Sequence, residues 1–327
     1  MSSRLDTFKI GFLVFLIAGL AFLWYGAKIT GVAEVREKVF MVETEPLVLP
    51  QHTHIPGVDT EYEHSLFAYG AMETKEDFWI ESFVSEVVGA PDEVVHHGEL
   101  MLEGKPDQQC PSSPDGTIQT EEPLWFVSNF NRNKDFTFPK PLGIFLAKGT
   151  KLKLAGMFHN PHQQDYADVR LRLTVRGQSS VRPDVEHRPI RYYRIMSEPC
   201  VRGNTFTVPP HTKNFIKRKV GGPFIFNESG TIFMLYPHFH FWAGGKFQNV
   251  LLNGEIAWKF YAPDPGSIFF RPNPLNPSQV TVTKGDRLDF EAVYDNTTDI
   301  PNPDAMAAVT FFLVPETMST HPELDFE

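Results

Sequence analysis

Two histidines, one residue apart in a short apolar run, have the spacing of a metal-binding pair. The run is Leu235-Tyr236-Pro237-His238-Phe239-His240-Phe241-Trp242, and its length and aromatic content are typical of a buried strand. Side chains at positions i and i+2 of a strand point to the same face. His238 and His240 could therefore bind one ion together, although two ordinary histidines near a core would give the same pattern.

A second candidate metal site begins with the adjacent residues His96 and His97. Neighbours on a regular strand face opposite sides, so one histidine could bind a metal while the other is structural. At a bulge or a strand end, both could converge on one ion. His159 ends an alternating pattern and is the best third ligand, with His162 as the runner-up. Imidazole suits copper, zinc, iron and nickel, so these histidines do not select the metal.

A further histidine pair lies close to the N-terminus. His52 and His54 stand between Pro50 and Pro56. Prolines on both sides favour an extended segment, and we interpret this pair as mainly structural.

Short strands are the elements that would position these histidines. Residues 169–175 alternate between apolar and polar, and later runs of the same kind are separated by turns rich in Pro and Gly. No stretch after residue 27 has the pattern of a long amphipathic helix. The sequence therefore predicts an all-β protein with two antiparallel β-sandwich domains, jelly-roll-like in type. We expect the domains to cover residues 51–183 and 184–327, after a linker at residues 28–50.

The N-terminal segment has the pattern of a membrane anchor. Residues 10–27 carry no charge and lie between Lys9 and Lys28. A helix of this length covers roughly 27 Å, close to the thickness of a hydrocarbon core. We expect one transmembrane helix, with residues 1–9 in the cytoplasm and the bulk of the chain extracytoplasmic, in the periplasm or outside the cell. A cleaved signal peptide is the alternative.

Charge and cysteine content limit the partners and the compartment. The chain has 327 residues and a formal net charge of −10, which argues against nucleic acid as a partner. Its two cysteines, Cys110 and Cys200, fit one disulfide in an oxidising compartment and fit two free thiols equally well.

The order of these motifs resembles the copper type II, ascorbate-dependent monooxygenases, the family of peptidylglycine α-hydroxylating monooxygenase and dopamine β-hydroxylase. That family has an adjacent histidine pair, a later single histidine, a His-x-His pair and a methionine. The matching residues here are His96, His97, His159, His238, His240 and Met306. Segments 55–62, 139–144, 149–151, 206–210, 244–246, 284–288 and 304–306 are also similar to the family's sequences. The resemblance covers residues 45–315, nearly the whole chain after the anchor.

The resemblance implies two copper ions, one in each domain. A first copper site would consist of His96, His97 and His159, and it would pass an electron from a donor such as ascorbate. A second copper site would consist of His238, His240 and Met306, and it would be catalytic because dioxygen binds there. Two imidazoles and a thioether form a soft site that suits cuprous copper. The implied activity is hydroxylation of a substrate C–H bond by a membrane-anchored, extracytoplasmic monooxygenase, with a solvent-filled cleft between its two copper sites.

The sequence also departs from the family. Two cysteines cannot reproduce the disulfide framework of the animal enzymes. Residues 307–310 lack the polar and aromatic side chains that grip a substrate carboxylate in those enzymes, which favours a small, apolar substrate. Two other functions remain open: a non-catalytic copper-binding or accessory subunit of a membrane complex with partner chains, and a cell-surface binding module whose histidines are incidental.

Overall fold

The computed structural model describes residues 37–51, 65–107, 109–110, 121–128, 135–179, 187–199, 204–240, 243–262 and 280–316. Those from residue 38 onward belong to one compact unit. The regular elements of these residues are strands and a 3-10 turn at Asp92–Val94, so the predicted all-β class is confirmed. No helix in these described ranges is long and apolar enough to cross a membrane. The expected anchor at residues 10–27 lies outside the described residues, as do His52 and His54.

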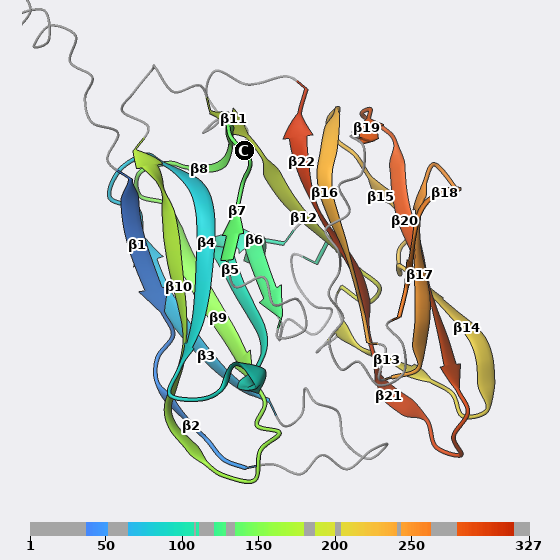
Figure 1. The fold of residues 1–327 in the computed structure, drawn as a ribbon. Coiled ribbons are helices and arrows are strands. Elements are labelled where there is room, and N and C mark those ends of the chain that lie inside the picture. The colour runs from blue at the N-terminus through green and yellow to red at the C-terminus, as the bar shows by residue number, and fades with distance from the viewer. Residues whose placement is uncertain are drawn as a thin grey trace, which may run out of the picture. The chain divides into compact units, whose positions relative to one another are not determined.

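The first half of the chain forms two sheets with one apolar core between them (Figure 1). The larger sheet has seven strands: β1 (Lys38–Glu43), β2 (Leu47–Leu49), β4 (Phe78–Val88), β7 (Asp135–Thr137), β8 (Leu142–Leu146), β10 (Tyr166–Ser179) and β11 (Arg188–Pro189). The smaller sheet has the order β3 (Leu66–Glu73), β9 (Lys151–Phe158), β5 (Val95–Pro106) and β6 (Glu121–Ser128). Within these two sheets, the pairing of β11 with β8 is parallel and the other pairings between described strands are antiparallel.

Strand β10 shows how the sequence pattern sets this packing. Its apolar residues at every second position, including Leu171 and Leu173, are buried in the core. Arg170 and Arg172 alternate with them and lie on the other face, where both form ion pairs with Glu43 of β1. Alternation of this kind is typical of a strand that packs one face and solvates the other.

Strands β1 and β2 lie in residues 28–50, which we expected to be a linker. Both pair with β10, so this stretch extends the larger sheet at its edge. The backbone between β1 and β2 also approaches the smaller sheet, because Glu45 N–H donates to the carbonyl of Tyr69 at 2.9 Å. A Cβ at Gly70 would lie 1.9 Å from the carbonyl oxygen of Glu43, so this approach requires glycine.

The second half of the chain forms three further sheets (Figure 1). One sheet has the order β12 (Arg191–Met196), β22 (Ala307–Pro315), β16 (Gly230–Phe239) and β19 (Val280–Val282). A five-stranded sheet contains β14 (Thr212–Arg218), β15 (Phe224–Ile225), β17 (Gly245–Leu252), β18 (Glu255–Tyr261) and β20 (Arg287–Asn296). The pair β13 (Phe206–Val208) and β21 (Asn302–Ala305) is a separate ribbon. A second apolar core contains residues from all three sheets.

Strand β22 is buried on both faces and joins the two halves. Val309 and Phe311 belong to the second core, while Phe312 and Val314 belong to the first. The ring of Phe312 contacts Phe136 of β7, with ring centroids 5.8 Å apart and the rings stacked. A solvent-filled cleft is therefore absent from this end of the junction between the described strands.

Two buried asparagines, one in each half, hold separate chain segments together through hydrogen bonds of their side-chain amides. The Asn160 amide donates to the carbonyls of Leu49 at 3.3 Å and Gln164 at 2.8 Å. The Asn296 amide donates to the carbonyls of Val208 at 3.1 Å and Ile300 at 2.9 Å. Each amide thus holds the turn that follows its strand to a neighbouring strand.

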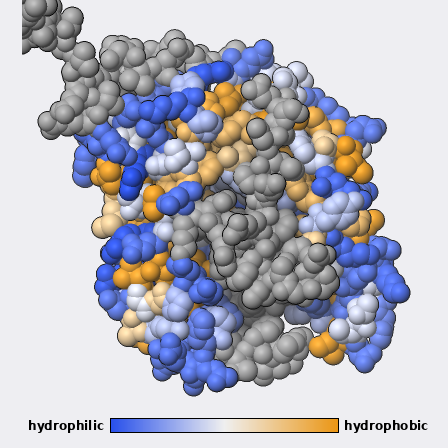
Figure 2. Space-filling model, in the orientation of Figure 1, coloured by the Kyte–Doolittle hydropathy of each residue, from blue (hydrophilic) through white to orange (hydrophobic). Residues whose placement is uncertain are grey.

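Hydrophilic side chains make up most of the described surface in the face shown in Figure 2, with smaller apolar patches between them. Large exposed apolar residues include Val39 and Met41 of the edge strand β1. Cys110 is buried and forms a disulfide, and the chain has one other cysteine, Cys200.

Candidate functional site

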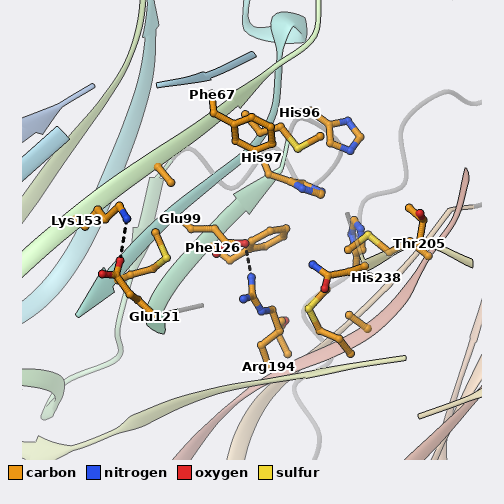
Figure 3. A pocket seen from close by; sticks show the side chains of 18 of the residues that line it. Phe67, His96, His97, Glu99, Glu121, Phe126, Lys153, Arg194, Thr205 and His238 are labelled. Atoms are coloured by element: carbon orange, nitrogen blue, oxygen red, sulfur yellow. Dashed lines mark hydrogen bonds and ion pairs between the residues drawn. The ribbon is translucent and has the colours of Figure 1, made fainter. Parts of the chain in front are cut away.

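A cavity of about 230 Å³ lies between the smaller sheet of the first half and the face of β12, β16 and β22. Its lining includes most of the residues that the sequence singled out as metal ligands: His96, His97, His238, His240 and Met306. Figure 3 shows His96 and His97 on one side of this cavity and His238 on the other. The remaining predicted ligand, His159, does not line it.

A bulge in β5 brings His96 and His97 to the same cavity. The pairing of β5 with β9 shifts register between Val95 and His97. Because a bulge interrupts strict alternation, neighbouring side chains can turn to the same side. The two imidazole rings are 4.2 Å apart between centroids. Of the two arrangements that the sequence allowed, the structure has the one in which both histidines converge.

Extended backbone places His238, near the end of β16, and His240, the residue that directly follows β16, on the same side. Phe239, between them, points into the second apolar core, and both histidines line the cavity. Their ring centroids are 5.4 Å apart. Phe241 and Trp242 lie outside the described residues.

Backbone hydrogen bonds place Met306 beside His240. The His240 N–H donates to the Met306 carbonyl at 3.1 Å, and the Tyr294 hydroxyl donates to the same oxygen at 2.5 Å. Met306 is buried and packs against Met196 and Ala308. Met306 thus lies beside the end of β16 where the His-x-His pair stands and lines the same cavity, although it is far from this pair in the sequence.

His159 lies close to His96, outside the cavity lining. Its backbone N–H donates to the Val94 carbonyl at 2.8 Å, two residues before His96. The runner-up His162 has a different neighbourhood, because its ring contacts Tyr166 with centroids 5.8 Å apart. The structure therefore favours His159 over His162 as a neighbour of the adjacent histidine pair.

The two histidine pairs face each other across the cavity. His97 and His238 have ring centroids 5.4 Å apart, and His96 and His240 have centroids 6.0 Å apart. We call these residues the histidine quartet: His96, His97, His238 and His240.

Burial keeps three of the imidazoles neutral, those of His96, His97 and His238. It lowers the pKa of His96 to about 3, with smaller contributions from His238 and His159. Burial also lowers the pKa of His238 to about 4, helped by the positive charge of Arg194. The pKa of His97 is lowered as well, first by burial and then by the neighbouring histidines and Arg194. Neutral imidazole is the form that binds metal.

Arg194 is a charged residue of the cavity lining that the sequence did not single out. It lies on β12, is buried, and forms an ion pair with Glu99 of β5 (Figure 3). Asp107 lies 3.8 Å from the same guanidinium. Burial alone would lower the pKa of Arg194, but the nearby acidic groups outweigh it and raise the pKa. One sequence signal could have indicated Glu99, since it follows His97 by two positions and so shares its side of β5.

The donor set suits a metal, but the side chains do not enclose one as they stand. In the described ranges, no group of three or more His, Cys, Asp or Glu is arranged to hold an ion. The Nε2 atoms of His97 and His238 are buried and have no hydrogen-bond partner among the described residues. A buried polar atom without a partner costs free energy, which a metal ligand bond would remove.

Comparisons with known proteins give weak structural similarities at low sequence identity. No family model matches the chain, and no curated protein matches it. PNGase F, a glycosylasparaginase from Flavobacterium meningosepticum, is 9% identical over 86% of this chain and 97% of its own, with a TM-score of 0.41. The major capsid protein P2 from bacteriophage PM2 is 8% identical over 87% and 99%, with a TM-score of 0.40. PNGF-II is 10% identical over 86% of this chain, which spans 66% of PNGF-II, with a TM-score of 0.38. Similarity at this level carries no argument about function.

Proposed function

We propose that this protein is a copper monooxygenase that uses dioxygen to hydroxylate a C–H bond of a small, apolar substrate. One observation carries the proposal: residues from both predicted copper sites line a single cavity between two sheets. In the sequence these residues are spread from position 96 to position 306. Incidental histidines on a binding module would have no reason to meet in this way.

The residues present fit copper as the bound metal. His96, His97 and His159 would hold one ion, and His238, His240 and Met306 the other. Imidazole suits copper among several metals, and a thioether is a soft ligand that favours copper in its reduced state. Bound copper would supply the redox chemistry that activates dioxygen, with electrons from a donor such as ascorbate.

The chain's own contribution would be to position the metal ligands and to hold an apolar substrate away from bulk water. Phe67, Phe126 and Ala155 line the cavity together with Met157. At another part of the lining, Lys153 forms an ion pair with Glu121 at 3.2 Å and lies over the Tyr69 ring. A small apolar ligand would contact the aromatic and aliphatic part without having to desolvate a charge of its own.

The proposal includes the architecture expected from the sequence. Two jelly-roll-like β-sandwiches, the first containing β1 to β11 and the second β12 to β22, would each contribute one metal site. An N-terminal transmembrane helix at residues 10–27 would tether them on the extracytoplasmic side, in the periplasm or outside the cell.

A second candidate is a non-catalytic copper-binding or accessory subunit of a membrane complex. The packing of Phe312 against Phe136 favours it, because the two halves are in direct contact there and not separated by the solvent-filled cleft that the monooxygenase resemblance implies. In that role the protein would bind copper without turning over dioxygen.

Metal analysis and oxygen consumption test the two candidates. We expect the purified protein to bind copper and to consume dioxygen with ascorbate and an apolar substrate. Substituting Met306→Ala should abolish turnover while the copper held by His96, His97 and His159 remains. Met72→Ala, on β3, removes a methionine away from the cavity and is the control. Unchanged turnover in Met306→Ala would refute the assigned role, and protein without copper would refute both candidates.

A further inference from the structure

The floor of the cavity is a regular grid of side chains on one face of the smaller sheet. Cross-strand partners in a sheet point to the same face. Phe67 of β3 and His97 of β5 both pair with Met157 of β9, and all three residues line the cavity. One row of the grid therefore runs from Phe67 across Met157 to the histidine quartet, and Figure 3 shows Phe67 beside His97.

A second row of the grid lies two residues further along each strand. Tyr69 and Glu99 both pair with Ala155, and Glu99 also pairs with Phe126 of β6. These four residues line the cavity as well. Ala155 thus stands between the long side chains of Tyr69 and Glu99, and it has the smallest side chain of the two rows.

The small side chain of Ala155 leaves a hollow in this floor. Along β9, Lys153 and Met157 stand two positions before and after Ala155, so they share its face. Ala155 is partly exposed although its neighbours on this face are long, so solvent reaches down to the sheet at this point. The cavity is therefore open above Ala155 and is bounded by larger side chains around it.

The rim of the cavity on the β3 side is aromatic. Phe67 is 40% exposed and Tyr69 is 47% exposed, and β3 is the first strand in the order of its sheet. Both rings belong to the cavity lining, so they mark a side on which the cavity meets solvent. A ligand that entered here would pass two aromatic rings before it reached Ala155.

The charges of the cavity lining neutralise each other. Its described acidic and basic residues form two ion pairs, Lys153 with Glu121 and Arg194 with Glu99. A charged ligand would have to break one of these pairs or give up its own hydration without a matching partner, and both cost free energy. The lining therefore favours a neutral ligand.

The volume and the chemistry of the lining favour an aromatic ligand. A cavity of about 150 Å³ with apolar walls binds benzene. The cavity here has a volume of about 230 Å³, which leaves room for a ligand of one or two rings. Three aromatic rings and several methionines line it, including Phe126 and Met157. An aromatic ligand gains edge-to-face contacts with such rings and favourable contacts with thioether sulfur, beyond what burial of its area provides.

We propose that the cavity binds a neutral aromatic ligand of one or two rings, which lies over Ala155, and that Ala155 sets the largest ligand that the site accepts. This inference deepens the proposed function by naming a substrate class. It rests on that function only for the statement that the bound molecule is a substrate, because binding itself requires no reaction.

Ligand binding to the full-length protein, without a reductant so that no turnover occurs, tests the inference. Headspace partitioning gives the affinities of benzene, cyclohexane and naphthalene, and calorimetry gives that of 2-naphthoate. Ala155→Leu is the test variant, because it fills the hollow with an apolar side chain. Ala71→Leu is the matched control, since Ala71 is an exposed alanine on β3 that pairs with Lys153 but does not line the cavity.

A hollow over Ala155 predicts a loss that depends on ligand size. Ala155→Leu should weaken naphthalene binding about 10-fold or more and benzene binding less, because a pocket distinguishes ligands by single methylene groups to this extent. Ala71→Leu should change neither affinity. Unchanged naphthalene binding in Ala155→Leu, or an equal loss in Ala71→Leu, would overturn the role of Ala155.

The ligand panel tests the chemical class on the unsubstituted protein, independently of how any variant folds. Naphthalene should bind more tightly than 2-naphthoate. Benzene should bind more tightly than cyclohexane once their different partitioning into an alkane is allowed for. Tighter binding of 2-naphthoate would show that the site takes an anion, and equal binding of benzene and cyclohexane would show that aromatic character does not matter; either result refutes the proposed ligand class.

Oxygen consumption separates this inference from the proposed function. Naphthalene that binds over Ala155 but supports no ascorbate-driven oxygen consumption would overturn the monooxygenase and leave the ligand class standing. Oxygen consumption with a saturated substrate, in a protein that does not bind naphthalene, would overturn the ligand class and leave the monooxygenase standing.

Discussion

Removing the Arg194 guanidinium should destabilise the protein far more than removing an exposed one. Arg194→Met keeps the aliphatic stem but removes the charge that faces Glu99 and Asp107. The side chain of Arg194 is 8% exposed, and those of Glu99 and Asp107 are 21% and 10% exposed. The substitution therefore leaves two carboxylates in a poorly solvated place without their cation.

The expected size of the effect follows from this burial. Breaking a fully buried ion pair by removing one partner costs about 3–5 kcal/mol. Because Glu99 retains some contact with water, the expected loss is somewhat smaller, about 2–4 kcal/mol in the free energy of unfolding. Glu99→Gln leaves Arg194 with Asp107 and should cost less. The double variant should be less destabilised than the sum of the single ones, since the two substitutions remove one interaction.

Urea unfolding at pH 7, in the presence of a chelator, measures these differences. The matched control is Arg218→Met, which removes an arginine that also pairs with a glutamate, Glu291, but whose side chain is 63% exposed. We expect the control to retain nearly full stability, because exposed ion pairs contribute little. Equal losses in Arg194→Met and Arg218→Met would show that burial of the pair does not matter. Additive losses in the double variant would show that Arg194 and Glu99 are not coupled.

Three further predictions concern pH, glycine and asparagine. The pKa of His238 is about 4 in the folded state, against an ordinary value of 6.5. Between these two pH values the unfolded state binds more protons than the folded state, so the stability of the fold falls as the pH drops from 7 to 4. In urea unfolding of the metal-free protein, this residue should lower the free energy of unfolding by on the order of 3 kcal/mol. A urea midpoint that stays constant from pH 7 to 5 would contradict this prediction. Gly70→Ala should cost several kcal/mol in thermal or urea unfolding, because its Cβ would overlap the Glu43 carbonyl. The control is Gly104→Ala, whose Cβ meets no atom within 4 Å and which should cost about 1–2 kcal/mol for its positive φ. Equal costs for the two variants would refute the overlap. Asn160→Ala removes the two hydrogen bonds that the amide donates and the one that its oxygen accepts from His162 N–H, and it should cost about 1–3 kcal/mol by the same assay. No measurable loss of stability would contradict this prediction.

Local patterns in the sequence were sufficient to predict the features of the fold that residues close together in the chain determine. Alternation in β10 predicted its two faces, and the i, i+2 rule predicted that His238 and His240 share a side. The adjacent pair His96 and His97 was ambiguous, because whether a strand contains a bulge depends on how its partner pairs with it. That partner, β9, lies more than fifty residues away along the chain.

Pairings distant in sequence could not be predicted. The charged residues of strand β1 favour a connector when the sequence is considered alone. Its place in a sheet comes only from its pairing with β10. Arg194 stands in a stretch with no motif, and its importance comes from Glu99, which is 95 positions earlier. The closeness of the two histidine pairs depends in the same way on how β5 and β16 are placed by their sheets, which no spacing in the sequence encodes.

The amide of Asn296 also decides where the chain could carry a carbohydrate. Asn296-Thr297-Thr298 and Asn227-Glu228-Ser229 both have the N-x-[ST] pattern of an N-glycosylation acceptor. A glycan is joined to the amide nitrogen, and at Asn296 that nitrogen is buried and donates to the carbonyls of Val208 and Ile300. A sugar there would replace both hydrogen bonds and separate β13 from β20, whereas Asn227 is exposed. In a host that glycosylates secreted proteins, the folded chain can therefore accept sugar at Asn227 and excludes it at Asn296.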